Sequence, residues 1–167
     1  GRVKFICQRC EALFDPQGKA VRLIGTMQDV SHSKQTERAL QRLNRDLRLL
    51  SDCNTALVHA QDEATLLRDI CRLGVDSGGY TLAWVGFAQQ DEERSVTVAA
   101  QHGALSNYLE EARITWADNA LGRGVVGTAI RTGQPSLVTD IPHDPRMGPW
   151  VAKTAELNLQ SCVSLPL

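Results

Sequence analysis

Aromatic side chains stand near acidic and basic residues in the second half of this sequence. Aromatic residues make up only 5% of the chain, yet three of them are tryptophans near predicted strands and loops. Small-molecule pockets combine apolar walls with a few polar groups that orient the ligand. Core filling is the alternative role for Trp84, whereas Trp116 and Trp150 lie beside loops. We therefore predict a ligand pocket lined by Tyr80, Trp84, Trp116, Asp140, Arg146 and Trp150.

A glycine pattern, G-x-G-x-x-G, spans Gly122–Gly127, follows a possible strand and opens a predicted helix. In dinucleotide-binding proteins this pattern cradles a pyrophosphate at a helix N-terminus. The next acidic residue, Asp140, is too near to bind a ribose, and regular parallel βαβ units are missing. A turn whose glycines permit close packing is the other interpretation. A nucleotide-binding enzyme that uses this loop is therefore kept as the alternative function.

Catalytic and metal-binding patterns are not found in the sequence. Cys7 and Cys10 have the spacing of half a zinc knuckle, but no second pair follows and a strand would point them to opposite faces. The four histidines are far apart and lack a recognisable ligand spacing. We predict neither catalytic residues nor a metal site, and the sequence does not identify a cofactor.

A ladder of apolar residues runs through the only long helical stretch, which begins near Asp29 to Ser33 and reaches about His59. Its spacing alternates between three and four, which is typical of a seam packed against a partner helix. Asn54 occupies one position of this seam, and a buried asparagine there would fix the register of a parallel helix pair. An amphipathic helix lying on its own domain is the alternative. We predict a homodimer through Leu40, Leu43, Leu47, Leu50, Asn54 and Leu57.

The elements around this helix are mixed. Two β-like runs, 3–14 and 20–27, flank a Pro-Gly turn and predict an antiparallel hairpin. After the long helix, Asp62 is a candidate N-cap for the next one. Further strands are expected at 80–88, 95–101, 114–116, 136–140 and 162–165, and helices at 107–112, 125–132 and 150–157. Strands outnumber the helices that could connect them in parallel, so the fold class is α+β with an antiparallel sheet flanked by helices.

Charge and hydropathy restrict the partners. The 167 residues carry a formal net charge of -1, so neither nucleic acid nor an anionic membrane surface is an expected partner. No apolar run approaches the roughly 20 residues that span a bilayer, and the first residues lack the apolar core of a signal peptide. The predicted location is the cytoplasm.

The first part of the chain resembles the C-terminal strands of a PAS domain. The stretch 14–19 and the run Arg22 to Ser31 carry the resemblance, which ends in Asp29-Val30-Ser31, similar to the D-[IV]-[ST] signature before a signalling helix. The resemblance covers about the final third of a PAS domain. It implies that Asp29 and Ser31 form the junction between a truncated PAS hairpin, residues 1–31, and a linker helix, residues 32–60.

Residues 61–167 resemble a GAF domain of bacterial multidomain sensors without its C-terminal end. The resemblance rests on Gly78-Gly79-Tyr80, 83–86, 114–116, 127–133, 140–146 and 164–167. The motifs that bind cyclic nucleotides or attach a bilin are missing. The resemblance implies a non-catalytic sensory module that relays a small molecule or partner through the helix to a diguanylate cyclase, cyclic-di-GMP phosphodiesterase or histidine kinase. A ligand-free dimerisation spacer is a further alternative.

Overall fold

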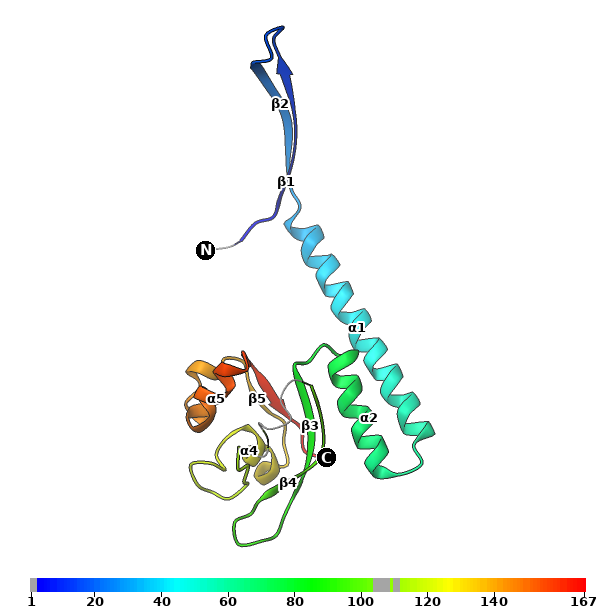
Figure 1. Cartoon of the computed structure of the whole chain (residues 1–167), viewed down its shortest axis with the longest axis vertical. Coiled ribbons are helices and arrows are strands. Elements are labelled where there is room, and N and C mark those ends of the chain that lie inside the picture. Colours follow the sequence, from blue (N-terminus) through cyan, green and yellow to red (C-terminus); the bar gives the residue numbers. More distant parts are fainter. Residues whose placement is uncertain (1–2, 104–108, 110–111) are drawn as a thin grey trace. The chain divides into compact units, whose positions relative to one another are not determined.

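The computed structural model describes residues 3–103, 109 and 112–167, and the chain divides into two compact units (Figure 1). The first unit is Gly1–Leu47 and the second is Arg48–Leu167. Helix α1, Ser31–His59, contributes residues to both. None of the helices in the described ranges combines the length and the apolar character needed to cross a bilayer.

The first unit contains a β-hairpin. Strands β1, Ile6–Phe14, and β2, Ala20–Asp29, pair antiparallel with an irregularity between Leu13 and Phe14. The turn forms because an Asp15 side-chain oxygen accepts hydrogen bonds from the backbone N–H groups of Gln17 and Lys19. Gly18 adopts the positive φ of 80° that this turn requires. The apolar side chains of the hairpin are exposed, with Met27 and Leu23 at 69% and 67%.

Helix α1 has no fully buried residue. In the second unit, its half-buried positions are Leu49, Cys53 and Ala56, whose spacing places them on one face. Helix α2, Glu63–Asp76, lies beside this part of α1, and the Ser77 hydroxyl donates to an Asp52 carboxylate oxygen at 3.0 Å. The predicted N-cap of α2 is confirmed, since Asp62 accepts a hydrogen bond from the Thr65 backbone N–H.

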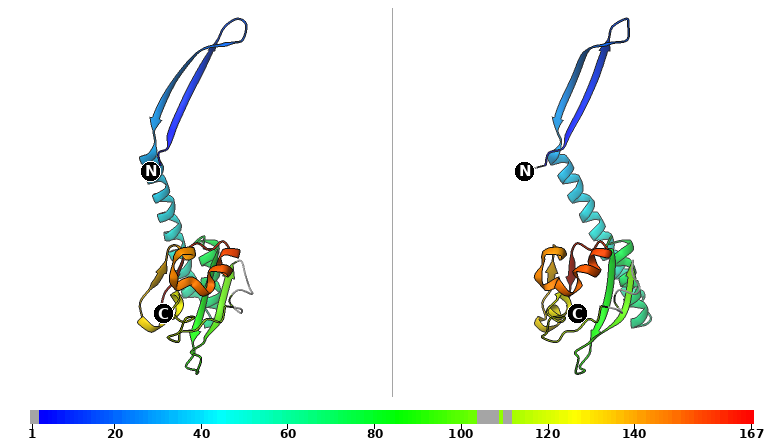
Figure 2. Two further views of the ribbon diagram at one scale, coloured as in Figure 1. Left: turned by 90° about the vertical axis from the view of Figure 1, so that its left-hand side faces the viewer. Right: turned by 60° about the vertical axis from the view of Figure 1, so that its left-hand side comes forward.

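Strands β3, Leu82–Ala88, and β4, Val96–Gly103, form an antiparallel pair that packs against α2 (Figure 2). Helix α2 and strand β3 approach each other closely at Gly74, where an added Cβ would lie 3.1 Å from the Ala83 Cβ. The predicted strand at 114–116 is wrong. Only Thr115 forms a bridge, antiparallel to Ser95, because the chain follows β4 briefly before it turns away. The helix expected at 107–112 lies largely outside the described residues.

The remaining elements surround a small apolar core. Helix α4 is Val125–Thr132, as predicted, and α5 is Val151–Glu156. Strands β5, Ser136–Val138, and β6, Cys162–Ser164, pair antiparallel and are shorter than expected. Two 3-10 helices, η1 at Ile141–His143 and η2 at Pro145–Trp150, were not predicted. The buried core residues are Val125, Val138, Ile141 and Met147.

The secondary structure is mixed, as expected, but the described strands form separate two-stranded sheets rather than one antiparallel sheet. The orders are β1-β2, β3-β4 and β5-β6. Strand lengths explain the difference, because β5 and β6 have three residues each and segment 114–116 contributes a single bridge. Such short pairings leave few hydrogen bonds with which to extend a sheet.

Candidate functional site

Trp116 is held beside the β3–β4 loop. Its indole Nε1 donates to the Gln89 carbonyl oxygen at 2.9 Å, and the Arg94 guanidinium carbon lies 4.6 Å from the centroid of the Trp116 ring. A cation above an aromatic face is attracted by the ring quadrupole. Both the polar end and one face of this indole therefore have partners within the protein.

Trp150 and Arg146 both belong to η2 but contact different groups. The Trp150 ring covers Gly124, where an added Cβ would lie 2.6 Å from a ring carbon, and its Nε1 donates to the Ala112 carbonyl oxygen at 3.3 Å. Arg146 Nη2 pairs with an Asp144 carboxylate oxygen at 2.6 Å and donates to the Leu137 carbonyl oxygen at 3.0 Å. The hydrogen bonds from Arg146 lower the pKa of Asp144.

The other three predicted pocket residues lie elsewhere. Asp140 is exposed, and its carboxylate lies 2.9 Å from His143 Nδ1. Tyr80 is 56% exposed before β3, and Trp84 is half-buried on β3. Within the described residues, no hydrogen bond or ion pair joins two of the six predicted pocket side chains. Their role in a common pocket stays a prediction.

A hollow of about 360 Å³ lies at another place, between the start of β3 and the end of β4. The residues that line it are Leu82, Gln101, His102 and Gly103. Ligand pockets usually enclose most of a bound molecule with apolar walls. A lining of four residues, two of them polar, is poorly suited to that, so we place no ligand in this hollow.

The glycines of the Gly122–Gly127 loop lie against other parts of the protein. A Cβ at Gly122 would overlap the Ala117 carbonyl oxygen, and one at Gly127 would overlap the Gly122 carbonyl oxygen. The Trp150 ring occupies the corresponding space at Gly124. Each glycine of the motif is thus required by packing. This observation favours the interpretation of the motif as a tight turn.

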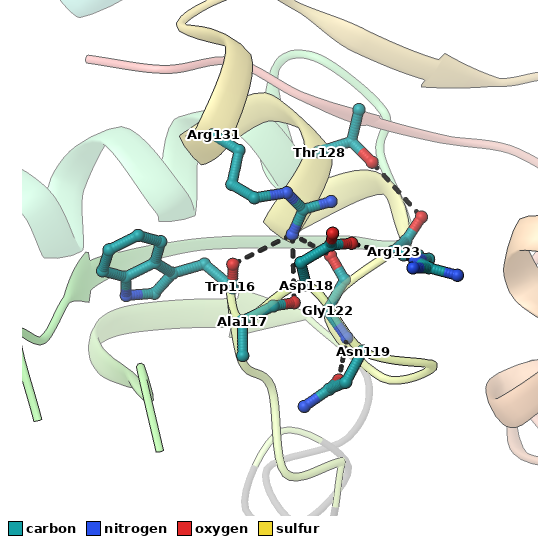
Figure 3. A network of polar contacts seen from close by, with 8 residues as sticks. All are labelled: Trp116, Ala117, Asp118, Asn119, Gly122, Arg123, Thr128 and Arg131. Atoms are coloured by element: carbon teal, nitrogen blue, oxygen red, sulfur yellow. Dashed lines mark hydrogen bonds and ion pairs between the residues drawn. The ribbon is translucent and has the colours of Figure 1, made fainter. Parts of the chain in front are cut away.

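Arg131 organises this turn (Figure 3). Its Nη1 lies 2.9, 3.1 and 2.6 Å from the carbonyl oxygens of Trp116, Ala117 and Gly122. Nearby, the Asn119 side chain accepts from the Gly122 N–H at 2.8 Å, and Arg123 pairs with Asp118 at 2.9 Å. Arg131 is not among the site residues predicted from the sequence. One signal was available: it is the single charged residue of α4 and requires either solvent or several acceptors.

Residues 60–167 match the family model of the GAF domain. The chain belongs to the GAF domain family. The matched residues include α2 and every described element that follows it. No curated protein matches the chain. GAF domains are generally regulatory, small-molecule-binding domains of signalling proteins, so the resemblance of 61–167 to a GAF domain is confirmed.

Ser136 gives a stability prediction for the GAF domain. Its hydroxyl is buried and has no hydrogen-bond partner among the described residues. A buried hydroxyl without a partner costs roughly 1–3 kcal/mol. We expect Ser136→Ala to raise the melting temperature by a few degrees, which thermal unfolding monitored by circular dichroism would measure.

Thr154 supplies the matched control, because it is equally buried but its hydroxyl lies 2.9 Å from the Trp150 carbonyl oxygen. Thr154→Val should lower the melting temperature, since it removes a satisfied hydrogen bond worth about 1 kcal/mol. A lower melting temperature for Ser136→Ala would contradict the assignment of an unpaired hydroxyl.

The predicted junction residues Asp29 and Ser31 form a compact cluster in the first unit. The Ser31 N–H donates to an Asp29 carboxylate oxygen at 3.0 Å, and the Ser31 hydroxyl oxygen accepts from the Phe5 N–H at 2.8 Å. Lys4 approaches Asp29 at 3.1 Å, and the Arg38 guanidinium lies 4.6 Å from the Phe5 ring centroid. The first turn of α1 is therefore attached to the base of the hairpin.

This junction should depend on pH. A hydrogen bond from the Ser31 side chain is the largest cause that lowers the pKa of Asp29 from 3.8 to about 2, followed by the one from the Ser31 backbone N–H and by the interaction with Lys4. A lowered pKa means that the carboxylate stabilises the junction above pH 3.8 and that this stabilisation is lost as the pH falls towards 2. NMR titration of the Asp29 carboxyl carbon should give a midpoint near the lower value. Ser31→Ala should raise that midpoint more than Lys4→Gln, and the opposite order would contradict the assigned causes.

Proposed function

We propose that this chain is a non-catalytic sensory module of a bacterial signal-transduction protein. In this proposal, the GAF domain binds a small molecule or a protein partner, and α1 relays the event as one half of a parallel helix pair. The observation that carries the proposal is the leucine seam of α1. Its leucines, Leu40, Leu43, Leu47, Leu50 and Leu57, are between 54% and 60% exposed.

The seam and the face of α1 that packs in the second unit are different. Leu50 and Leu57 belong to the seam, whereas Leu49, Cys53 and Ala56 are half-buried. At 3.6 residues per turn, the centre of the five seam leucines and the centre of the half-buried face are roughly 120° apart. The alternative, an amphipathic helix that covers its leucines on its own domain, does not account for this separation. A second copy of α1 would cover the seam.

The contacts of α1 supply a route for the relay. The Asp52 carboxylate accepts a hydrogen bond from Ser77 at the end of α2, and α2 packs on β3 and β4. A rearrangement of the GAF domain can therefore change the position of α1. Two arrangements of the helix need differ in free energy by only a few kcal/mol to act as a switch.

The proposed output domain is a diguanylate cyclase, a cyclic-di-GMP phosphodiesterase or a histidine kinase. In this proposal the hairpin belongs to a PAS domain, and the whole protein is located in the cytoplasm.

Sedimentation velocity of the chain over a range of concentrations tests the helix pair. A dimer at micromolar concentration is expected. A monomer at high micromolar concentration would remove the premise of the relay.

A separate experiment addresses the ligand. Native mass spectrometry of gently purified protein detects a bound molecule, and thermal shifts across a metabolite panel detect stabilisation by binding. A co-purifying nucleotide would instead support the nucleotide-binding alternative. Unchanged melting temperatures across the panel would support a ligand-free dimerisation spacer.

A further inference from the structure

The GAF domain consists of two groups of elements. Helix α2 packs against β3 and β4, whereas α4 packs against β5 and β6. Segment Ile114–Ala117 lies between these groups in the chain and contacts both of them. Motion can pass from one group to the other where such contacts persist.

The β3–β4 hairpin holds this segment through several hydrogen bonds. The Trp116 N–H donates to the Arg94 carbonyl oxygen at 2.9 Å, and the Val96 N–H donates to the Ile114 carbonyl oxygen at 3.0 Å. The buried Thr115 hydroxyl lies 2.7 Å from the Glu93 carbonyl oxygen. With the contacts of the Trp116 indole to Gln89 and Arg94, these bonds make the segment an extension of the hairpin.

The other group holds the segment through Arg131 of α4. One guanidinium nitrogen approaches the carbonyl oxygens of Trp116 and Ala117, and also that of Gly122 in the following turn (Figure 3). The nearby carboxylate, Asp118, pairs with Arg123, and this hydrogen bond lowers the pKa of Asp118. Among the described residues, the hydrogen bonds of the Arg131 side chain go to backbone carbonyl oxygens. The three carbonyl oxygens share the two N–H groups of one nitrogen, Nη1, so the loss of this nitrogen would remove all three contacts together.

We propose that Arg131 couples the two groups, so that α4 and the β3–β4 hairpin open and move together. Without it, α4 would retain its own contacts with β5 and β6 but lose the hydrogen bonds that connect it to segment Ile114–Ala117. The use of this coupling in signalling rests on the proposed function. The coupling itself does not require a ligand or a dimer.

Hydrogen exchange under mild denaturant measures the coupling, because it reports which amides open together. In the unaltered chain, the slowest amides of α4 and of β3–β4 should exchange through one common opening. In Arg131→Gln, the α4 amides should exchange at least tenfold faster than those of β3–β4. Arg123→Gln is the matched control, since it removes a neighbouring guanidinium whose one ion pair among the described residues is with exposed Asp118. Both groups should stay within about twofold of the unaltered chain.

Acceleration of both groups by the same factor in Arg131→Gln, or of neither, would overturn the proposal, because Arg131 would then be a general stabiliser or dispensable. If Arg131→Gln does not fold, Arg131→Lys provides the test. It retains the charge and should separate the two groups by a smaller factor, and equal acceleration would again contradict coupling. A monomeric chain with a normal exchange pattern would contradict the helix pair but leave the coupling intact.

Discussion

Gly122→Ala should destabilise the GAF domain severely. The added Cβ would overlap the Ala117 carbonyl oxygen, which is backbone and is itself an acceptor for Arg131. Relief would require the turn to move away from Arg131, which also bonds to the Gly122 carbonyl oxygen. We expect the free energy of unfolding to fall by at least about 3 kcal/mol, because overlap with fixed backbone cannot be relieved by a side-chain rotation. Thermal and urea unfolding would measure it.

Gly148→Ala is the matched control for this substitution. No heavy atom lies within 4 Å of the Cβ that it would add, and its φ is not positive. The melting temperature should be unchanged or slightly raised, since alanine restricts the unfolded chain. Equal effects of the two substitutions would show that the close approach at Gly122 is not what the turn requires.

Local signals in the sequence were sufficient for several elements. The bounds predicted for α4 are those observed, because Gly124 precedes it and Gly133 follows it with a positive φ of 61°. Asp62 begins α2 for an equally local reason, the side-chain acceptor that it offers to the first turn. These features need only neighbouring residues, so a single sequence contains the information.

Features that depend on distant partners were not predictable in this way. Segment 114–116 has the composition of a strand, but its pairing ends at Thr115 because Arg131 and the glycine turn direct the chain elsewhere. The 3-10 helices η1 and η2 contain Pro142, Pro145 and Pro149, which fix φ and remove N–H donors without defining a particular turn. Tertiary contacts decided these conformations.

The candidate site shows the same division. The sequence identified residue types suited to a pocket, but it could not show that Trp116 and Trp150 bond to different segments or that Asp140 pairs with His143. The glycine motif, in contrast, allowed two interpretations, and the contacts of its three glycines favour packing. Side-chain identity restricts chemistry, whereas convergence of side chains requires the fold.

Leu47→Asp should weaken self-association of the chain by at least roughly a hundredfold. Leu47 is 54% exposed and lies near the middle of the seam. Each copy in a symmetric pair would lose a buried leucine worth roughly 1.5–3 kcal/mol and would place a carboxylate opposite its equivalent. Because the substitution removes nothing from the half-buried face of α1, the GAF domain should retain its melting temperature as a monomer. Sedimentation velocity would measure the change in the dissociation constant.

Gln41→Asp distinguishes loss of the seam from a general effect of charge on the helix. It introduces the same side chain on the polar face of α1, roughly 150° from the centre of the seam at 3.6 residues per turn. Both variants place aspartate in a helix interior and should reduce helicity similarly. Association should therefore persist in Gln41→Asp and be lost in Leu47→Asp. Equal weakening in both would point to helix propensity, whereas unchanged association in both would show that the leucines do not form the interface and that α1 does not act as the proposed relay.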